Sequence, residues 1–435
     1  MTAVPRTPHA RAARLSAAPA LAGLALAGLA ALAAPASGQE ATNLPPWTPG
    51  TLDIHHIATG QGNSTFFVLP DGTTMLVDAG APTLPGQVPI ADPRPNGSRS
   101  TGEWIARYVT RVAPAGREPE IDYALLTHFD RDHMGAVSDR SPWSADGAYQ
   151  LSGITDVAER VPIRSVLDRG WPDYDYPAPI EHPRVANYRR FLEAKRSDGL
   201  EVARFEAGRS DQVRLLRDPA AYPSFEVRNL FVNGDVWTGE GDAVDRIVPP
   251  LETVPRQDWP TENHSSPAFL LRYGDFSYYT GGDLQGVPPD GYPVWSDQET
   301  PIARAIGEPV DVVVINHHGS IEPANAFFLG TLRPRVSIVP SWSKTHPAPV
   351  VLKRLLNERI YSEARDIFIL EFRDETKAAI GGRAERVASD HGHVVVRVAP
   401  GGDSYRVFVL DNRTESGAVL STHGPYSADG AEREE

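Results

Sequence analysis

The feature that most constrains the fold is a short apolar run that ends directly in a dense group of metal-binding side chains. The run Ile121–Thr127 has the composition of a buried strand, and it is followed by His128, Phe129, Asp130, Arg131, Asp132 and His133. Imidazole and carboxylate groups are common ligands of zinc and similar ions. A polar turn with a helix cap at Asp132 is the plain alternative, but chance seldom places two His and two Asp in this order. The sequence therefore predicts a metal site at the end of a strand.

The spacing of these residues indicates how they share ions. Side chains two positions apart in an extended segment point the same way. We therefore expect His128 and Asp130 to bind one ion together. Asp132 and His133 are adjacent and diverge, so they can reach a second position.

Two further strand ends carry similar groups. The predicted hairpin of Ser266–Tyr273 and Phe276–Tyr279 leads into Gly281, Gly282 and Asp283, and such glycines let the backbone come close to a site. The apolar strand Val310–Ile315 leads into Asn316, His317, His318, Gly319 and Ser320. We expect the three strand-end clusters to converge on a pair of cations. Which of the two adjacent His residues binds metal is left open.

The order His-x-Asp-x-Asp-His resembles the signature of the metallo-β-lactamase superfamily, in the variant with Asp130 in place of the second His. That variant is typical of the soluble hydrolase-like domain of the DNA-uptake protein ComEC. Residues 60–64, 69–72 and 76–80 are similar to the opening strands of the family. The resemblance covers most of residues 52–400, and it implies an α/β layered fold, the four-layer αββα sandwich.

The resemblance also implies site roles. The segment Asn263–Pro267 is similar to the third family motif, which would make His264 a ligand of the first ion, and Asp283 would bridge both ions. The full set of expected metal ligands is His128, Asp130, Asp132, His133, His264, Asp283, His317 and His318.

Other positions are expected to orient a ligand or contact substrate. They are Asp78, Asn63, Ser320 and His346. The family usually has Asp at position 63, and His346 belongs to a His-Pro motif. A plain turn is the alternative for Asp78, and a structural role near a helix start is the alternative for His346.

The implied chemistry is hydrolysis by a hydroxide that bridges two divalent ions, with Asp132 as the catalytic residue that holds it and takes its proton. Zinc is the first expectation, and manganese is possible because Asp130 is a hard ligand. The family suggests a phosphodiesterase or nuclease-like activity. The alternatives are an ester, lactone or β-lactam hydrolase, and an exported binding protein with a degenerate site.

The first 38 residues carry three Arg, then the apolar run Leu21–Ala34, then the small residues Ala36, Ser37 and Gly38. This is the three-part pattern of a secretory signal. The run is too short and too rich in Ala and Gly to span a membrane comfortably. We therefore expect an exported protein, periplasmic or extracellular, that is soluble and has no stable membrane anchor. The chain has no Cys, so any metal ligands must be His, Asp or Glu.

The remaining organisation is expected to be simple. Residues 39–50 are predicted to be a linker, 51–412 one hydrolase domain with an insertion around 170–260, and 413–435 a polar tail. The formal net charge of −14 becomes −17 without the three Arg of the signal. Such an acidic surface disfavours long-range attraction of nucleic acid but does not exclude a locally basic cleft. The expected substrate is a small molecule or a phosphodiester, and nucleic acid stays a possible but disfavoured one. The sequence contains no obvious dimerisation segment such as a heptad run, so the oligomeric state is left open.

Overall fold

The computed structural model describes residues 43–428, which contain two large β-sheets. The first sheet has nine strands in the order β17-β16-β15-β1-β2-β3-β4-β5-β6. Its strands are β1 (Leu52–His56), β2 (Thr65–Val68), β3 (Thr74–Val77), β4 (Ile121–Leu126), β5 (Ile163–Asp168), β6 (Glu201–Arg204), β15 (His393–Val398), β16 (Ser404–Leu410) and β17 (Val419–Ser427).

The second sheet has eight strands in the order β14-β13-β12-β11-β10-β7-β8-β9. Its strands are β7 (Glu226–Val232), β8 (Asp235–Trp237), β9 (Val244–Arg246), β10 (Ala268–Tyr273), β11 (Phe276–Thr280), β12 (Val312–Val314), β13 (Val336–Val339) and β14 (Asp366–Ile369). One apolar core contains side chains from both sheets, such as Phe67 and Phe269, so the sheets pack face to face.

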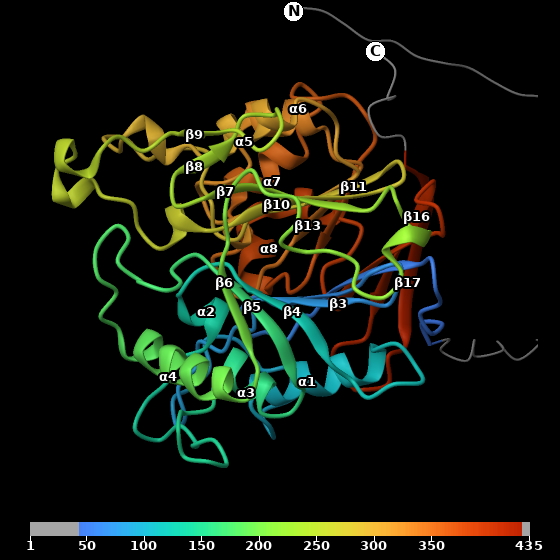
Figure 1. Ribbon diagram of the computed structural model, residues 1–435. Helices are drawn as coiled ribbons and strands as arrows, with labels where there is room; N and C mark the ends of the chain where they lie inside the picture. The colour runs from blue at the N-terminus through green and yellow to red at the C-terminus, as the bar shows by residue number, and fades with distance from the viewer. Residues whose placement is uncertain (1–42, 429–435) are drawn as a thin grey trace, which may run out of the picture. The chain divides into compact units, whose positions relative to one another are not determined.

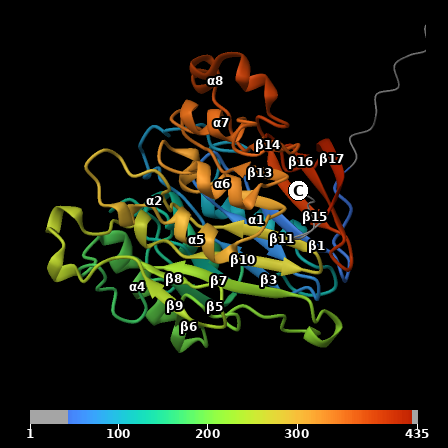
Figure 2. The ribbon, with the colours of Figure 1, turned by 90° about the horizontal axis from the view of Figure 1, so that it is seen from above.

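Helices cover the two outer faces. The first sheet packs against α1 (Thr101–Val112), α3 (Ile154–Ala158) and α4 (Pro183–Ser197), and the second against α5 (Glu299–Ile306), α6 (Ala326–Leu332), α7 (Pro349–Leu355) and α8 (Asp374–Ile380). Figure 1 shows α1, α3 and α4 below the sheets and α5 and α6 above them, and Figure 2 looks onto α5, α6 and α7 above the second sheet. The α/β layered fold expected from the sequence, a four-layer αββα sandwich, is confirmed.

Coverage on both faces explains why the central strands are short continuous apolar runs. All residues of β2, β3 and β4 are buried, as in sheets that lie between two layers. β3 runs parallel to β4, and β11, β12 and β13 run parallel to one another. Parallel strands end at the same edge of their sheet, so the polar segments that follow β11 and β12 lie side by side. The segment that follows β4 meets them from the first sheet, since His133 Nε2 lies 3.1 Å from Asp283 Oδ1.

The segment 170–260 differs from the expected insertion. It provides α4, the edge strand β6 and the strands β7–β9, and β7 pairs with β10 inside the second sheet. The segment is therefore largely part of the sandwich. Exposed positions dominate β6 and β9, so these edge strands lack the apolar run that marks a central strand.

The expected polar tail also differs, because β17 pairs antiparallel with β16 at the edge of the first sheet. The Tyr426 ring packs 5.0 Å from the Tyr405 ring, centroid to centroid, and its hydroxyl donates a hydrogen bond to Asp366 of the second sheet at 2.7 Å. The alternation of partly and fully exposed residues in β17 is that of an edge strand. Residues 429–435 lie outside the described part of the chain.

The expected signal, residues 1–38, also lies outside the described residues. The described part of the expected linker contacts the domain, since Asn43 forms a bridge with Ala418 and the Trp47 indole donates to the Thr51 carbonyl at 2.6 Å. Between residues 43 and 428, none of the helices has the length and apolar character required to cross a bilayer.

Candidate metal centre

Two tight loops hold the turn that carries Asp132 and His133. The turn is the short helix α2 (Arg131–Met134), directly after β4. The Asp132 carbonyl accepts a hydrogen bond from the Asn63 amide at 2.8 Å. A Cβ atom at Gly80 would lie 2.0 Å from that carbonyl oxygen, so only glycine permits this approach. The glycine-rich opening segments of the sequence thus hold the second half of the His/Asp motif in place.

Asp78 orients His133 from behind. It follows β3 with a left-handed φ of 60°, and its carboxylate accepts hydrogen bonds from the Thr127 amide at 2.8 Å and from Asn63 Nδ2 at 3.1 Å. The same carboxylate lies 2.7 Å from His133 Nδ1. A carboxylate on one ring nitrogen fixes the tautomer and turns the other nitrogen toward a metal. Asp78 and Asn63 therefore lie where ligand-orienting residues are expected.

The two adjacent His residues follow β12 in a strained turn. His317 and His318 have φ values of 46° and 53°, a region that non-glycine residues seldom adopt outside functional sites. His318 Nδ1 donates to the Pro340 carbonyl at 3.0 Å, which leaves Nε2 facing Asp132 and Asp283. His317 Nδ1 lies 2.8 Å from Ser320 Oγ. Both His residues reach the cluster, and Ser320 orients His317.

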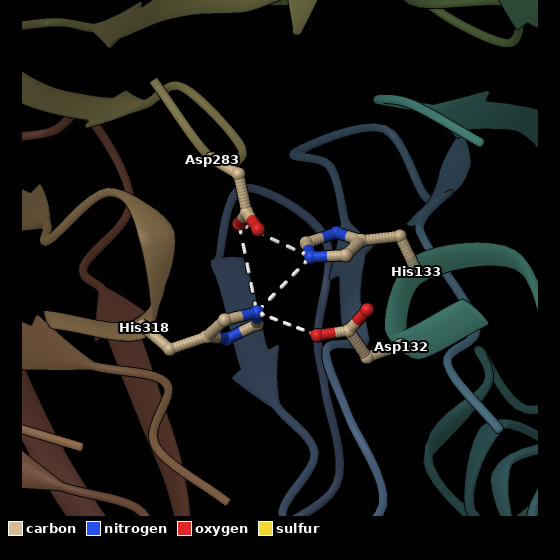
Figure 3. Close-up of side chains that lie close together, drawn as sticks. All are labelled: Asp132, His133, Asp283 and His318. Atoms are coloured by element: carbon tan, nitrogen blue, oxygen red, sulfur yellow. Dashed lines mark hydrogen bonds and ion pairs between the residues drawn. The ribbon is translucent and has the colours of Figure 1, made fainter. Parts of the chain in front are cut away.

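Figure 3 shows Asp132, His133, Asp283 and His318, whose potential ligand atoms all lie within 4.8 Å of one another. His133 Nε2 is 3.1 Å from His318 Nε2 and 3.1 Å from Asp283 Oδ1, and His318 Nε2 is 3.3 Å from Asp132 Oδ2. We call these four residues the His318 half of the cluster.

The donor set of the His318 half demands a positive charge. The Nδ1 atoms of His133 and His318 are hydrogen-bonded to Asp78 and to the Pro340 carbonyl. The Nε2 lone pairs of these two rings therefore converge with the carboxylates of Asp132 and Asp283. Burial lowers the pKa of His133, but Asp283 and Asp78 outweigh burial and raise it well above its ordinary value. Burial raises the pKa of Asp283, and His133 and His318 reverse this and hold it well below its ordinary value. A divalent cation meets the same demand, so this half could hold a metal ion.

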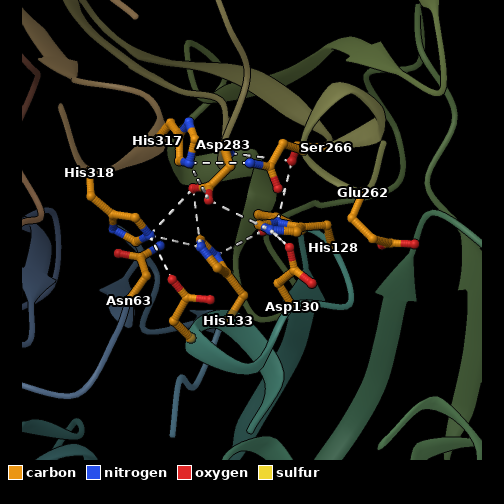
Figure 4. A network of polar contacts seen from close by, with 12 residues as sticks. Asn63, His128, Asp130, His133, Glu262, Ser266, Asp283, His317 and His318 are labelled. Atoms are coloured by element: carbon orange, nitrogen blue, oxygen red, sulfur yellow. Dashed lines mark hydrogen bonds and ion pairs between the residues drawn. The ribbon is translucent and has the colours of Figure 1, made fainter. Parts of the chain in front are cut away.

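A second group lies beside Oδ2 of Asp283. It consists of His128 and Asp130, and we call it the Asp130 half of the cluster. His128 Nε2 is 3.7 Å from Asp283 Oδ2 and 3.7 Å from Asp130 Oδ2, and His317 Nε2 is also 3.7 Å from Asp283 Oδ2 (Figure 4). His128 is completely buried, and its Nε2 has no hydrogen-bond partner. Burial and the neighbouring His133 lower the pKa of His128 well below its ordinary value. A buried, neutral imidazole with a free lone pair is suited to bind a metal.

The structure does not bring His264 into this cluster. His264 lies in a short 3-10 helix, Asn263–Ser265, where its Nε2 is 3.1 Å from Gln285 Oε1 and its Nδ1 accepts from the Thr261 amide at 3.1 Å. Both ring nitrogens are therefore occupied elsewhere. Its neighbour Asn263 instead reaches His317 Nε2, at 3.2 Å.

His346 lies beside the His318 half. Its ring stacks on His318 with centroids 5.2 Å apart and an interplanar angle of 18°. Its Nδ1 is buried without a hydrogen-bond partner. Burial, followed by the charge of His318, lowers the pKa of His346 to about 3, so the ring is neutral near pH 7. A substrate-binding role for His346 stays a prediction.

Four charged residues around the cluster belong to no sequence motif and were not predicted. Glu322 accepts a hydrogen bond from Ser320, and Glu262 accepts one from the Phe129 amide at 3.0 Å. Arg184 of α4 contacts Asp130 at 2.7 Å, and the buried Glu299 lies behind Asn316. Each is a single charged residue in a helix or loop without a recognisable pattern, so only the tertiary structure places it at the site.

No family model and no curated protein matches the chain. Among solved structures, the chain is similar to human tRNase Z, short form, with a TM-score of 0.29 and 11% sequence identity, over 66% of this chain and 91% of that one.

Proposed function

We propose that this protein is a metal-dependent hydrolase of the metallo-β-lactamase superfamily, and that its cluster binds two divalent ions, zinc in the first place. The observation that carries the proposal is the meeting of His133 Nε2 and His318 Nε2, 3.1 Å apart, with two carboxylates. The unpartnered Nε2 of the buried His128 supports a second ion.

Each ion would have its own set of ligands. Asp132, His133 and His318 would hold one ion, His128 and Asp130 the other, and Asp283 would contribute one oxygen to each. Bound ions of this kind lower the pKa of water and polarise the bond to be cleaved.

Asp132 is the proposed general base. It is the most exposed carboxylate of the His318 half, with 19% of its side chain accessible against 5% for Asp283. It is therefore placed to take the proton of the attacking water and pass it on. The neutral His346 ring, stacked on His318, lies beside this group.

The proposed substrate is a phosphodiester of modest size. The Arg184 guanidinium, which lies beside Asp130, is a permanent positive charge next to the cluster. An acidic chain with a charge of −14, or −17 without the three Arg of the first 38 residues, disfavours a long polyanion such as nucleic acid. The proposed setting is outside the cytoplasm, which rests on the signal-like pattern of residues 1–38.

A metal analysis combined with a substrate panel tests the proposal. The panel contains bis-nitrophenyl phosphate, chromogenic esters, lactones and β-lactams, each assayed with added zinc and with added manganese. We expect bound metal and turnover of the phosphodiester. Turnover of carbonyl substrates alone would move the assignment to an esterase, lactonase or lactamase. A protein with neither metal nor turnover would be a binding protein.

Replacement of the central ligands should abolish turnover. We expect Asp132→Ala and His133→Ala to lower kcat by at least about 10³-fold, because each removes a group that acts in the transition state. Circular dichroism should show that both variants stay folded. The matched control is Asp139→Ala, an exposed carboxylate on the same loop, which should keep full activity. Full activity in either site variant would contradict the assignment.

A further inference from the structure

The two halves of the cluster differ in how well they are prepared for an ion. In the His318 half, four potential ligand atoms already lie within 4.8 Å of one another, and no other group of this kind occurs among residues 43–428. Its imidazole–carboxylate distances are 3.1 Å for His133 Nε2 to Asp283 and 3.3 Å for His318 Nε2 to Asp132, whereas His128 Nε2 lies 3.7 Å from both Asp130 Oδ2 and Asp283 Oδ2. The Asp130 side chain is 38% exposed, against 19% for Asp132. The Asp130 half is therefore the more open of the two.

The imidazoles of the two halves are also oriented differently. His133 is held by the Asp78 carboxylate, which makes it a more basic ligand. His128 Nδ1 meets only the neutral hydroxyls of Thr127 at 3.2 Å and Ser266 at 3.3 Å. His317 could add a ligand to the Asp130 half, but its Nε2 accepts a hydrogen bond from Asn263.

The decisive contact is made by Arg184. Its Nη2 donates to Asp130 Oδ1 at 2.7 Å, its Nε donates to the Phe129 carbonyl, and its Nη1 lies 2.8 Å from His182 Nε2. These three contacts hold the guanidinium against the carboxylate that the second ion would need. Arginine stays charged at all relevant pH values, so it both neutralises Asp130 and repels a divalent cation beside it.

We propose that the cluster binds one divalent ion tightly in the His318 half and a second one weakly in the Asp130 half, and that Arg184 sets this difference by competing for Asp130. The inference rests on the proposed metal binding and adds an unequal affinity and a residue that controls it. The weak site fills when metal is abundant, so Arg184 makes occupancy of the second site depend on the supply of metal.

The test is a zinc titration of the metal-free full chain by competition with a chromogenic chelator. The wild type should show two classes of site that differ at least tenfold in Kd. Arg184→Gln should tighten the weaker class by at least fivefold and leave the tighter class unchanged. Arg190→Gln, an exposed arginine on the same helix, is the matched control and should change neither class.

Asp130→Asn gives a second, independent measurement if Arg184→Gln fails to fold. This variant should lose the weak class and keep the tight one. Two classes of equal affinity, an unchanged weak class in Arg184→Gln, or loss of the tight class in Asp130→Asn would each overturn the inference while metal binding stands. Absence of any zinc binding in the wild type would instead contradict the proposed function, and the inference with it.

Discussion

At the scale of single residues, Glu299 shows how one buried carboxylate fixes a ligand loop. It is fully buried and accepts hydrogen bonds from Asn316 Nδ2 at 2.9 Å and from the amides of Ala324 and Asn325 at 2.9 and 2.8 Å. These donors stand at the two ends of the loop that carries His317 and His318. Burial raises the pKa of Glu299 to about 7, although the three donors favour the charged form.

This pKa predicts a pH-dependent stability. The ordinary value is 4.5, so between pH 4.5 and 7 the folded protein binds more protons at Glu299 than the unfolded chain does. The contribution of Glu299 to the free energy of unfolding is therefore fully present below pH 4.5 and is lost as the pH rises through 7, by roughly 3 kcal/mol at most.

Glu299→Gln removes this dependence. We expect the free energy of unfolding of the variant, relative to wild type, to increase steadily from pH 4.5 to pH 7. Urea unfolding of both metal-free proteins across this range measures the difference, and ionisations common to both cancel. Parallel pH profiles for the two proteins would count against a proton-binding Glu299.

At the scale of elements, the sequence predicts what is apolar and continuous and misses what is short or half-exposed. The central strands β2–β4 and β11–β13 could be predicted from the sequence, because all their residues are buried and burial on both faces demands uninterrupted apolar runs. The edge strands β6, β9 and β17 carry exposed residues at many positions. Their place in the sheet is decided by pairing with the preceding strand, which the residues of the edge strand do not reveal by themselves.

Edge strand β17 should contribute to stability through Tyr426. Its ring is 7% exposed and packs on Tyr405, and its hydroxyl bonds to Asp366 across the sandwich. Tyr426→Ala should lower the free energy of unfolding by about 3–4 kcal/mol, as for other buried aromatic residues. Tyr426→Phe keeps the ring and should cost only about 1 kcal/mol. Thermal unfolding of both variants measures this, and an unchanged melting temperature in Tyr426→Ala would show that β17 does not brace the two sheets.

At the scale of the whole molecule, the site could be predicted to the level of its motifs and no further. The strands β4, β11 and β12 end at one edge of the sandwich. The segments that follow them bring together seven predicted ligands: His128, Asp130, Asp132, His133, Asp283, His317 and His318. His264 shares a motif position yet turns to Gln285, because the 3-10 helix around it sets the direction of its ring. Arg184, from a helix on the outer face of the first sheet, enters the site only through the packed sandwich.

The central claim is that these strand ends bind metal between them, and anomalous diffraction from crystals soaked in zinc tests it most directly. Data collected on the two sides of the zinc absorption edge should give a peak within coordination distance of His133 Nε2, His318 Nε2, Asp132 and Asp283, with a weaker peak next to His128 and Asp130. Crystals that show no zinc peak among these side chains, at a zinc concentration that saturates binding in solution, would contradict the account.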